Sequence, residues 1–150
     1  MKLTIEAEGN TKMAIQQQTF SVSRPPASVT MTTLTGLELQ AEAGDARAQF
    51  RLGEIYEEGR GVTPDAERAV ACYRRAAQQN NVEAQLALGV LYALGETVVR
   101  DFSQAFVWFT QAAAQGHEEA LTLRGLVLRE LDAVARERAE VEAWRQQAAL

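Results

Sequence analysis

The chain has 150 residues, of which 47% are hydrophobic and 23% charged, and its formal net charge is -5. This length favours one domain with a sizeable core, and the composition excludes a disordered or fibrous protein. The negative charge argues against nucleic-acid binding, which needs a concentrated basic face. A single cysteine excludes a disulfide framework and a cysteine-rich zinc site, so we expect a soluble, cytoplasmic protein in a reducing compartment.

Residues 1–32 differ in pattern from the rest of the chain. Lys2 starts the chain as in a signal peptide, but Glu6 and Glu8 interrupt the apolar run that export requires. The stretch KLTIEAEGNTKMAI alternates on both sides of Gly9-Asn10, which predicts an extended segment or a β-hairpin. Because an isolated hairpin is marginal in water, we expect this extension to be disordered, pinned to the rest, or paired with a partner's strand.

An internal repeat with an offset of 36 residues follows. AQFRLGEIYEEGRGV starts at Ala48, and AQLALGVLYALGETV starts at Ala84. Apolar residues recur at helical spacing in each copy, and glycines interrupt the pattern midway, so each copy predicts a pair of helices. The identities at this offset include Leu52-Gly53 with Leu88-Gly89, Tyr56 with Tyr92, Gly59 with Gly95, Asp65 with Asp101, and Ala76-Ala77 with Ala112-Ala113.

Partial copies flank the two full ones. A half-copy precedes them, and Thr35 with Glu38 predicts a capping box at its helix start. A degenerate copy follows, in which Gly125 keeps the phase but Leu131 stands where the other copies have a turn glycine, so its central turn should differ. The repeat region is predicted to cover residues 33–150.

These motifs resemble the Sel-one-like repeat (SLR) family, which is related to the tetratricopeptide repeats. The family pattern A-x-x-x-L-G-x-x-Y-x-x-G-x-G-V, followed by D-x-x-x-A and A-A, is met almost fully by residues 48–84, and the second copy departs from it at Thr97. The resemblance implies an all-α, right-handed α-solenoid of about three helix pairs after an N-terminal half-repeat. It also implies a non-enzymatic adaptor scaffold, often bacterial, whose partner is another protein or a peptide.

The helix predicted from Ala84 to Gly95 is apolar on two opposite faces. One face carries the residues that recur between copies and pack within the repeat. The other face, with its equivalents in the flanking copies, would line the concave groove of a solenoid. Acidic residues beside it would steer a basic partner. The predicted partner-binding residues are Phe50, Leu86, Val90, Leu94 and Leu126, with the acids Glu54, Glu57 and Glu58.

The sequence also allows other parts of the structure to bury this apolar stripe. Flanking repeats would enclose part of it in ordinary interior packing, or the N-terminal extension would fold over it through Leu3, Ile5, Phe20 and Val22. A second copy of the chain would also cover it, which makes a self-associating homodimer an alternative to an adaptor. An inhibitor or immunity-type regulator of a partner protein would use the same surface.

No combination of residues suggests an active site. His117 is the only histidine and is predicted in a turn, which excludes a two-histidine metal site. Cys72 aligns with Trp108 and is predicted to be a small buried hydrophobe rather than a nucleophile. The glycine-containing stretch EEGRGVTP lacks the lysine of a phosphate-binding loop. We therefore expect no enzymatic activity, no cofactor or metal, and no nucleic-acid or membrane partner.

Overall fold

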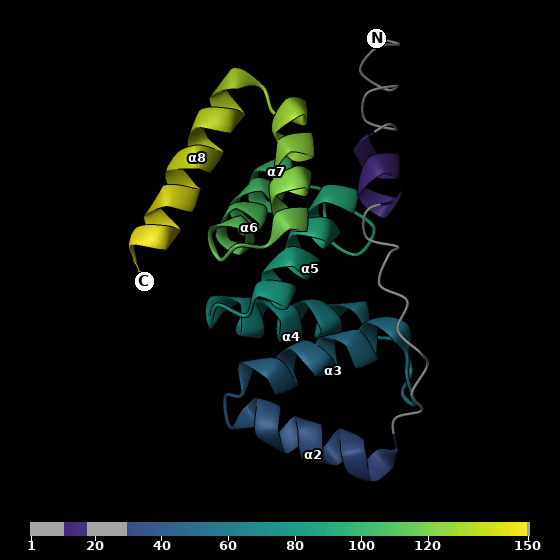
Figure 1. Cartoon of the computed structure of the whole chain (residues 1–150). Helices are drawn as coiled ribbons and strands as arrows, with labels where there is room; N and C mark the ends of the chain where they lie inside the picture. The colour runs from purple at the N-terminus through teal and green to yellow at the C-terminus, as the bar shows by residue number, and fades with distance from the viewer. Residues whose placement is uncertain (1–10, 18–29, 150) are drawn as a thin grey trace. The chain divides into compact units, whose positions relative to one another are not determined.

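The computed structural model describes residues 11–17 and 30–149, and all secondary structure in these two ranges is helical (Figure 1). The all-α class is therefore confirmed for the described residues. Two compact units divide the chain: a central unit of residues 24–88 and a C-terminal unit of residues 1–23 and 89–150. The helices are α1 (residues 11–17), α2 (Met31–Glu42), α3 (Ala46–Glu58), α4 (Ala66–Gln78), α5 (Val82–Leu94), α6 (Phe102–Ala114), α7 (Glu118–Glu130) and α8 (Ala133–Ala148).

In the central unit, α3 packs against both α2 and α4. The side chain of Asp45 accepts a hydrogen bond from the Ala48 amide at 2.8 Å at the start of α3, and Asp65 caps α4 in the same way. Gly59 ends α3 with φ 70°, a left-handed conformation that glycine adopts without strain. The hairpin predicted for the first full copy is therefore present, with its helix ends fixed by local hydrogen bonds.

A close contact between a glycine and an aromatic ring holds each full helix pair together. A Cβ atom on Gly53 of α3 would overlap the ring of Tyr73 in α4, whose side chain is fully buried. In the C-terminal unit, a Cβ atom on Gly89 would overlap the ring of Phe109 in the same way. The two pairs are related by the 36-residue offset, so the repeat conserves the contact while changing the ring.

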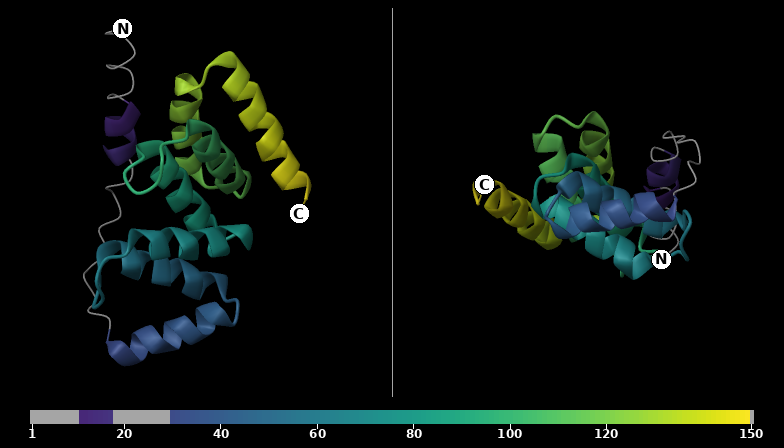
Figure 2. Two further views of the ribbon diagram at one scale, coloured as in Figure 1. Left: turned by 180° about the vertical axis from the view of Figure 1, so that it is seen from behind. Right: turned by 90° about the horizontal axis from the view of Figure 1, so that it is seen from below.

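The C-terminal unit contains the second half of α5, followed by α6, α7 and α8, and also α1. Among these helices, α6 packs against both α7 and α8 (Figure 2). Asp101 caps α6, and the Nδ1 atom of His117 accepts a hydrogen bond from the Ala120 amide at 3.4 Å at the start of α7. The only histidine of the chain is thus a helix cap at the position that Asp45 and Asn81 occupy in the earlier copies.

The last helix leaves the register of the repeat. Asp132 caps α8, whereas the positions of Asp65 and Asp101 predict the cap at residue 137. Only residues 131–132 separate α7 from α8, compared with 95–101 between α5 and α6. The Arg136 guanidinium donates to the carbonyls of Leu128 and Leu131 at 3.1 Å, where the other copies use a left-handed glycine. The expectation of a different central turn in the third copy is confirmed.

The structure corrects two predictions near the N-terminus. Residues 11–17 form a helix, so the second strand of the expected hairpin is wrong, and residues 1–10 lie outside the described part. The half-copy helix begins at Met31 and is capped by Thr30, while Thr35 lies inside it and donates its hydroxyl to the Met31 carbonyl at 3.0 Å. The expected capping box at Thr35 and Glu38 is therefore wrong, because the helix starts one turn earlier.

Candidate partner-binding surface

The predicted residues on α3 are partly engaged within their own helix pair. The Phe50 ring lies 5.6 Å from the Tyr73 ring, measured between centroids, and Phe50 is half-buried. The Tyr73 hydroxyl donates to the Glu57 carboxylate at 2.6 Å, and Glu58 forms an ion pair with Arg60. The acids expected to attract a basic partner are thus already engaged within the chain.

The predicted apolar stripe is divided between the two units. Phe50 and Leu86 belong to the central unit, and Val90, Leu94 and Leu126 belong to the C-terminal unit. All five side chains are half-buried, neither enclosed nor fully exposed. The opposite face of α5 is the packing face, since Ala84 and Leu88 are both fully buried. The burial pattern does not fully separate the two predicted faces, because Tyr92, which recurs between copies, is also half-buried.

Helix α1 lies against the C-terminal unit (Figure 1). The Thr11 hydroxyl donates to Glu130 of α7 at 2.5 Å, and the Lys12 ammonium lies 3.2 Å from Glu96, directly after α5. The Gln16 amide also donates to Glu96, at 3.4 Å. Ile15, between these polar contacts, has no exposed area. A helix of seven residues cannot bury a side chain against itself, so other parts of the chain enclose Ile15, and the polar contacts of Thr11, Lys12 and Gln16 tie α1 to α7 and to the end of α5.

The anchors of α1 lie next to the predicted stripe. Glu130 follows Leu126 by four residues on α7, which places both on the same helix face. Glu96 follows Leu94 by two residues at the end of α5. The sequence predicted that the N-terminal extension could cover the stripe, but it assigned this role to Leu3, Ile5, Phe20 and Val22. All four lie outside the described residues, and the observed anchor is Ile15.

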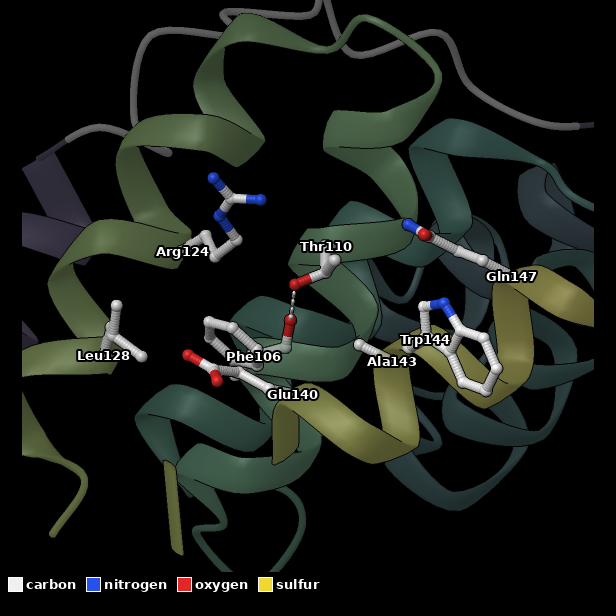
Figure 3. Close-up of a pocket in the computed structure, with 8 residues that line it drawn as sticks. All are labelled: Phe106, Thr110, Arg124, Leu128, Glu140, Ala143, Trp144 and Gln147. Carbon is white, nitrogen blue, oxygen red and sulfur yellow. Dashed lines mark hydrogen bonds between the residues drawn. The ribbon is translucent and has the colours of Figure 1, made fainter. Parts of the chain in front are cut away.

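A second kind of concave site recurs between helices of neighbouring copies. The central unit has a pocket of about 330 Å³ between α2, α3 and α4, and the C-terminal unit has one of about 320 Å³ between α6, α7 and α8 (Figure 3). The two pockets use equivalent repeat positions, 72 residues apart. Each of seven lining residues of the C-terminal pocket stands 72 positions after its counterpart in the central pocket: Thr110 after Glu38, Arg124 after Leu52, Leu128 after Tyr56, Glu140 after Arg68, Ala143 after Ala71, Trp144 after Cys72 and Gln147 after Arg75.

The chemistry of the two pockets differs. In the central one, the Arg68 guanidinium lies 5.4 Å from the centroid of the Tyr56 ring, and Arg75 donates to the Ala41 carbonyl at 3.1 Å. In the other, Figure 3 shows Trp144 of α8 at one end and Leu128 of α7 at the other. Trp144 is 69% exposed, so this end of the pocket is open to solvent.

Buried glutamines are the polar core residues that sequence reasoning missed. Gln85 is fully buried and donates its side-chain amide to the Ala77 carbonyl at 3.2 Å. Gln49 makes the equivalent contact to Ala41 at 2.9 Å. The Gln49–Ala41 and Gln85–Ala77 contacts are 36 residues apart. The Ala-Gln dipeptide at the start of both copies was therefore the sequence signal from which these buried contacts could have been predicted. The contact fastens the first helix of a copy to the end of the preceding helix.

Cys72 and His117 were considered above as reactive groups, and the surroundings of both suit a structural role. Cys72 is half-buried rather than buried, and desolvation raises the pKa of its thiol, which opposes thiolate formation. His117 is occupied as a helix cap. Within residues 11–17 and 30–149, no three His, Cys, Asp or Glu side chains gather as a metal site would require. In the same ranges, no helix is long and apolar enough to cross a membrane.

The chain is similar to several solved structures, two of which are described here. The first is a protective antigen present in uropathogenic Escherichia coli strains that displays an SLR fold, with 30% identity and a TM-score of 0.72 over 76% of this chain. The chain spans only 25% of the length of that antigen. The second is a Sel1 repeat protein from Oxalobacter formigenes, with 30% identity and a TM-score of 0.60 over 75% of this chain and 89% of the other.

The sequence comparison agrees with the structural one. The Sel1 repeat pattern matches residues 46–81 and 82–117, which are the two full copies. No curated protein sequence matches the chain. Identity and coverage with the Oxalobacter protein extend the likeness beyond these two repeats. The chain belongs to the Sel1 repeat family.

Proposed function

We propose that this protein is a non-enzymatic interaction module that binds a short helix of a partner protein on the face around Val90, Leu94 and Leu126. Sel1 repeat proteins are generally interaction scaffolds, which supports the class of function. The observation that carries the specific proposal is the docking of α1 in the C-terminal unit. We retain Phe50, Leu86, Glu54, Glu57 and Glu58 as a proposed partner-binding surface of the central unit by itself.

The contacts of α1 indicate what kind of helix the surface accepts. Ile15 provides one fully buried apolar anchor. Thr11 and Lys12 lie one turn before it and engage Glu130 and Glu96. A partner helix of this type would have a branched apolar residue preceded by a basic or hydroxyl residue, with acids of the module at both ends of the contact. Such helix-in-groove binding is a common mode of peptide recognition.

The position of α1 also implies competition. Because α1 belongs to the same chain as the surface, its effective concentration there is high. A partner helix must therefore displace α1 before it binds, and weakening the Ile15 anchor should raise the affinity for an added helix. We further propose that binding occurs in the cytoplasm, in keeping with the single cysteine.

A fluorescent peptide of residues 10–18 provides a probe for this surface. We expect the full chain with Ile15→Asp to bind the peptide at least about tenfold more tightly than the wild-type chain, because the cis helix no longer competes. Adding Val90→Asp or Leu126→Asp to this variant should abolish the binding, measured by fluorescence anisotropy. Val99→Asp serves as the matched control, since Val99 is 89% exposed and lies outside the surface.

The controls separate loss of binding from loss of fold. Circular dichroism must show the same helix content in every variant, and a peptide carrying Ile15→Asp should not bind. If the peptide binds equally to the chain with and without Val90→Asp and Leu126→Asp, this face is not the binding surface. If Leu86→Asp with Val90→Asp also leaves a copurifying partner in place while the fold is intact, the proposal is wrong.

A further inference from the structure

Helix α8 presents an unusual surface on the side away from its packing face. Ala139 and Ala143 are each 2% exposed and form the buried face of the helix against α6. On the opposite side, Val134 is 60% exposed, Val141 48% and Trp144 69%. Three large apolar side chains on one helix face are a sign of an interaction site rather than of a solvated surface.

The early start of α8 explains why this face is free of the repeat packing. Val141 occupies the repeat position of Ala69 and Ala105, which are 2% and 0% exposed. In the third copy the two-residue turn carries α8 onto α6 instead, and nothing lies within 4 Å of a Cβ placed on Gly125. The helix face that normally closes the hairpin is therefore turned outward.

The exposed residues of α8 follow a seven-residue spacing. A spacing of seven residues relates Val134 to Val141 and Val141 to Ala148. The same spacing relates Glu137 to Trp144 and Arg138 to Arg145, and every one of these residues is exposed. A strict spacing of seven is the pattern of a helix that pairs with another helix along one seam. Packing within the C-terminal unit does not require it, since the buried alanines lie on the other side.

The same residues are arranged symmetrically about Val141. Reversing the direction of the helix around this residue places Glu137 opposite Arg145, Arg138 opposite Trp144, and Val134 opposite Ala148. These are an ion pair, a cation–π pair and an apolar pair. A parallel arrangement in register would instead place Glu137 against Glu137 and Arg145 against Arg145. Charge complementarity thus selects an antiparallel pairing of two identical helices.

We propose that a second copy of this chain docks on α8, with the two α8 helices antiparallel and crossing at Val141. The contact is isologous, so each copy contributes the same residues and the pair closes without further growth. It uses a different surface from the one proposed for the partner helix, and neither proposal depends on the other. The seam is confined to one helix of each copy, so the dimer is expected to dissociate on dilution.

Charge reversal gives the first test, because both residues are exposed and their replacement leaves the core intact. We expect sedimentation velocity on the 150-residue chain to show a dimer that forms with rising concentration. Glu137→Arg or Arg145→Glu alone should weaken dimerisation about tenfold or more, and the double variant should restore it. A chain that stays monomeric at every concentration up to about 1 mM, or a double variant no better than the single ones, would overturn the proposal.

Cross-linking gives the second test and fixes the register. In a Cys72→Ala background, Val141→Cys should form a disulfide between two copies under mild oxidation, because the two residues meet at the symmetry axis. Val134→Cys is the matched control: the two copies of this residue are separated by about 21 Å along the helix axis and should not cross-link. Equal cross-linking of both variants would contradict the antiparallel register.

Discussion

The Tyr73 ring packs directly against the backbone of Gly53: a Cβ atom added to Gly53 would lie 2.4 Å from a ring carbon of Tyr73. Because Tyr73 is 1% exposed and its hydroxyl is bonded to Glu57, the ring has no free direction in which to move. The same relationship between Gly89 and Phe109 makes this contact the feature that closes each full hairpin.

Substituting these glycines should therefore have opposite effects in different copies. Gly53→Ala is expected to lower the free energy of unfolding by about 1–3 kcal/mol through overpacking. Gly125→Ala, in the third copy, should raise it by about 0.5–1 kcal/mol, because alanine favours the helix and the site is open. Urea denaturation followed by circular dichroism measures both. A loss of stability in Gly125→Ala as large as that in Gly53→Ala would contradict the role of the ring contact.

The Tyr73 hydroxyl gives the stability a specific dependence on alkaline pH. Burial, and then the neighbouring Glu57 carboxylate, raise the pKa of Tyr73 above its ordinary value of 10.0. Above pH 10 the unfolded chain loses this proton while the folded chain retains it, so the free energy of unfolding falls by up to about 1.4 kcal/mol per pH unit from this group. Below pH 10 the contribution is fully present.

Tyr73→Phe tests this dependence, since Phe109 shows that phenylalanine fits the same repeat position. At pH 7 the variant should lose only about 0.5–1 kcal/mol, the value of one hydrogen bond to a partly exposed acceptor. Between pH 9 and pH 11 its stability should decline less steeply than that of the wild-type chain, as measured by urea denaturation. Identical slopes would show that Tyr73 does not control the alkaline decline.

The buried glutamine contacts should contribute measurably to stability. Gln85→Leu removes the donor to the Ala77 carbonyl and is expected to cost about 1–2 kcal/mol. Gln78→Leu, at an exposed position nearby, should change stability by less than about 0.5 kcal/mol. Thermal unfolding of both variants at the same pH compares them. If the two substitutions have equal effects, the glutamine acts as a space filler and not through its hydrogen bond.

A better N-cap residue than His117 should stabilise α7. His117 accepts from the Ala120 amide at 3.4 Å, whereas Asn81 at the equivalent position accepts from the Ala84 amide at 2.8 Å. His117→Asn should therefore stabilise the protein by about 0.5 kcal/mol, and His117→Ala should destabilise it by a similar amount. If the melting temperature shifts in the same direction in both variants, the hydrogen bond of the helix cap does not account for the change in stability.

The sequence predicted the helices best where the copies of the repeat are most alike. The two full copies carry glycines, caps and alanine pairs at fixed positions, so their helices and their packing faces followed from local pattern alone. The position of α8 did not, because losing one turn glycine has no fixed structural consequence. Asp132 and Arg136 create a new start and a new cap, and neither belongs to the repeat pattern.

The candidate surface was predictable in part for the same reason. The second apolar face of α5 follows from periodicity, and Leu86, Val90 and Leu94 on it are half-buried. The docking of α1 was not predictable in detail, because it depends on contacts across long sequence separations, such as Thr11 with Glu130. The alternating pattern of the extension indicated a strand, and tertiary contacts favoured a helix instead.

The crossing of α8 onto α6 also has a consequence for cooperativity. In an array where each helix pair touches only its neighbours, the end can fray without disturbing what precedes it. Here Gln111 of α6 is hydrogen-bonded to Gln146 of α8, and Ala139 and Ala143 are sealed against the same unit. Detaching α8 uncovers a helix of the preceding copy, so amides of α6 and α8 should exchange with solvent in one concerted opening.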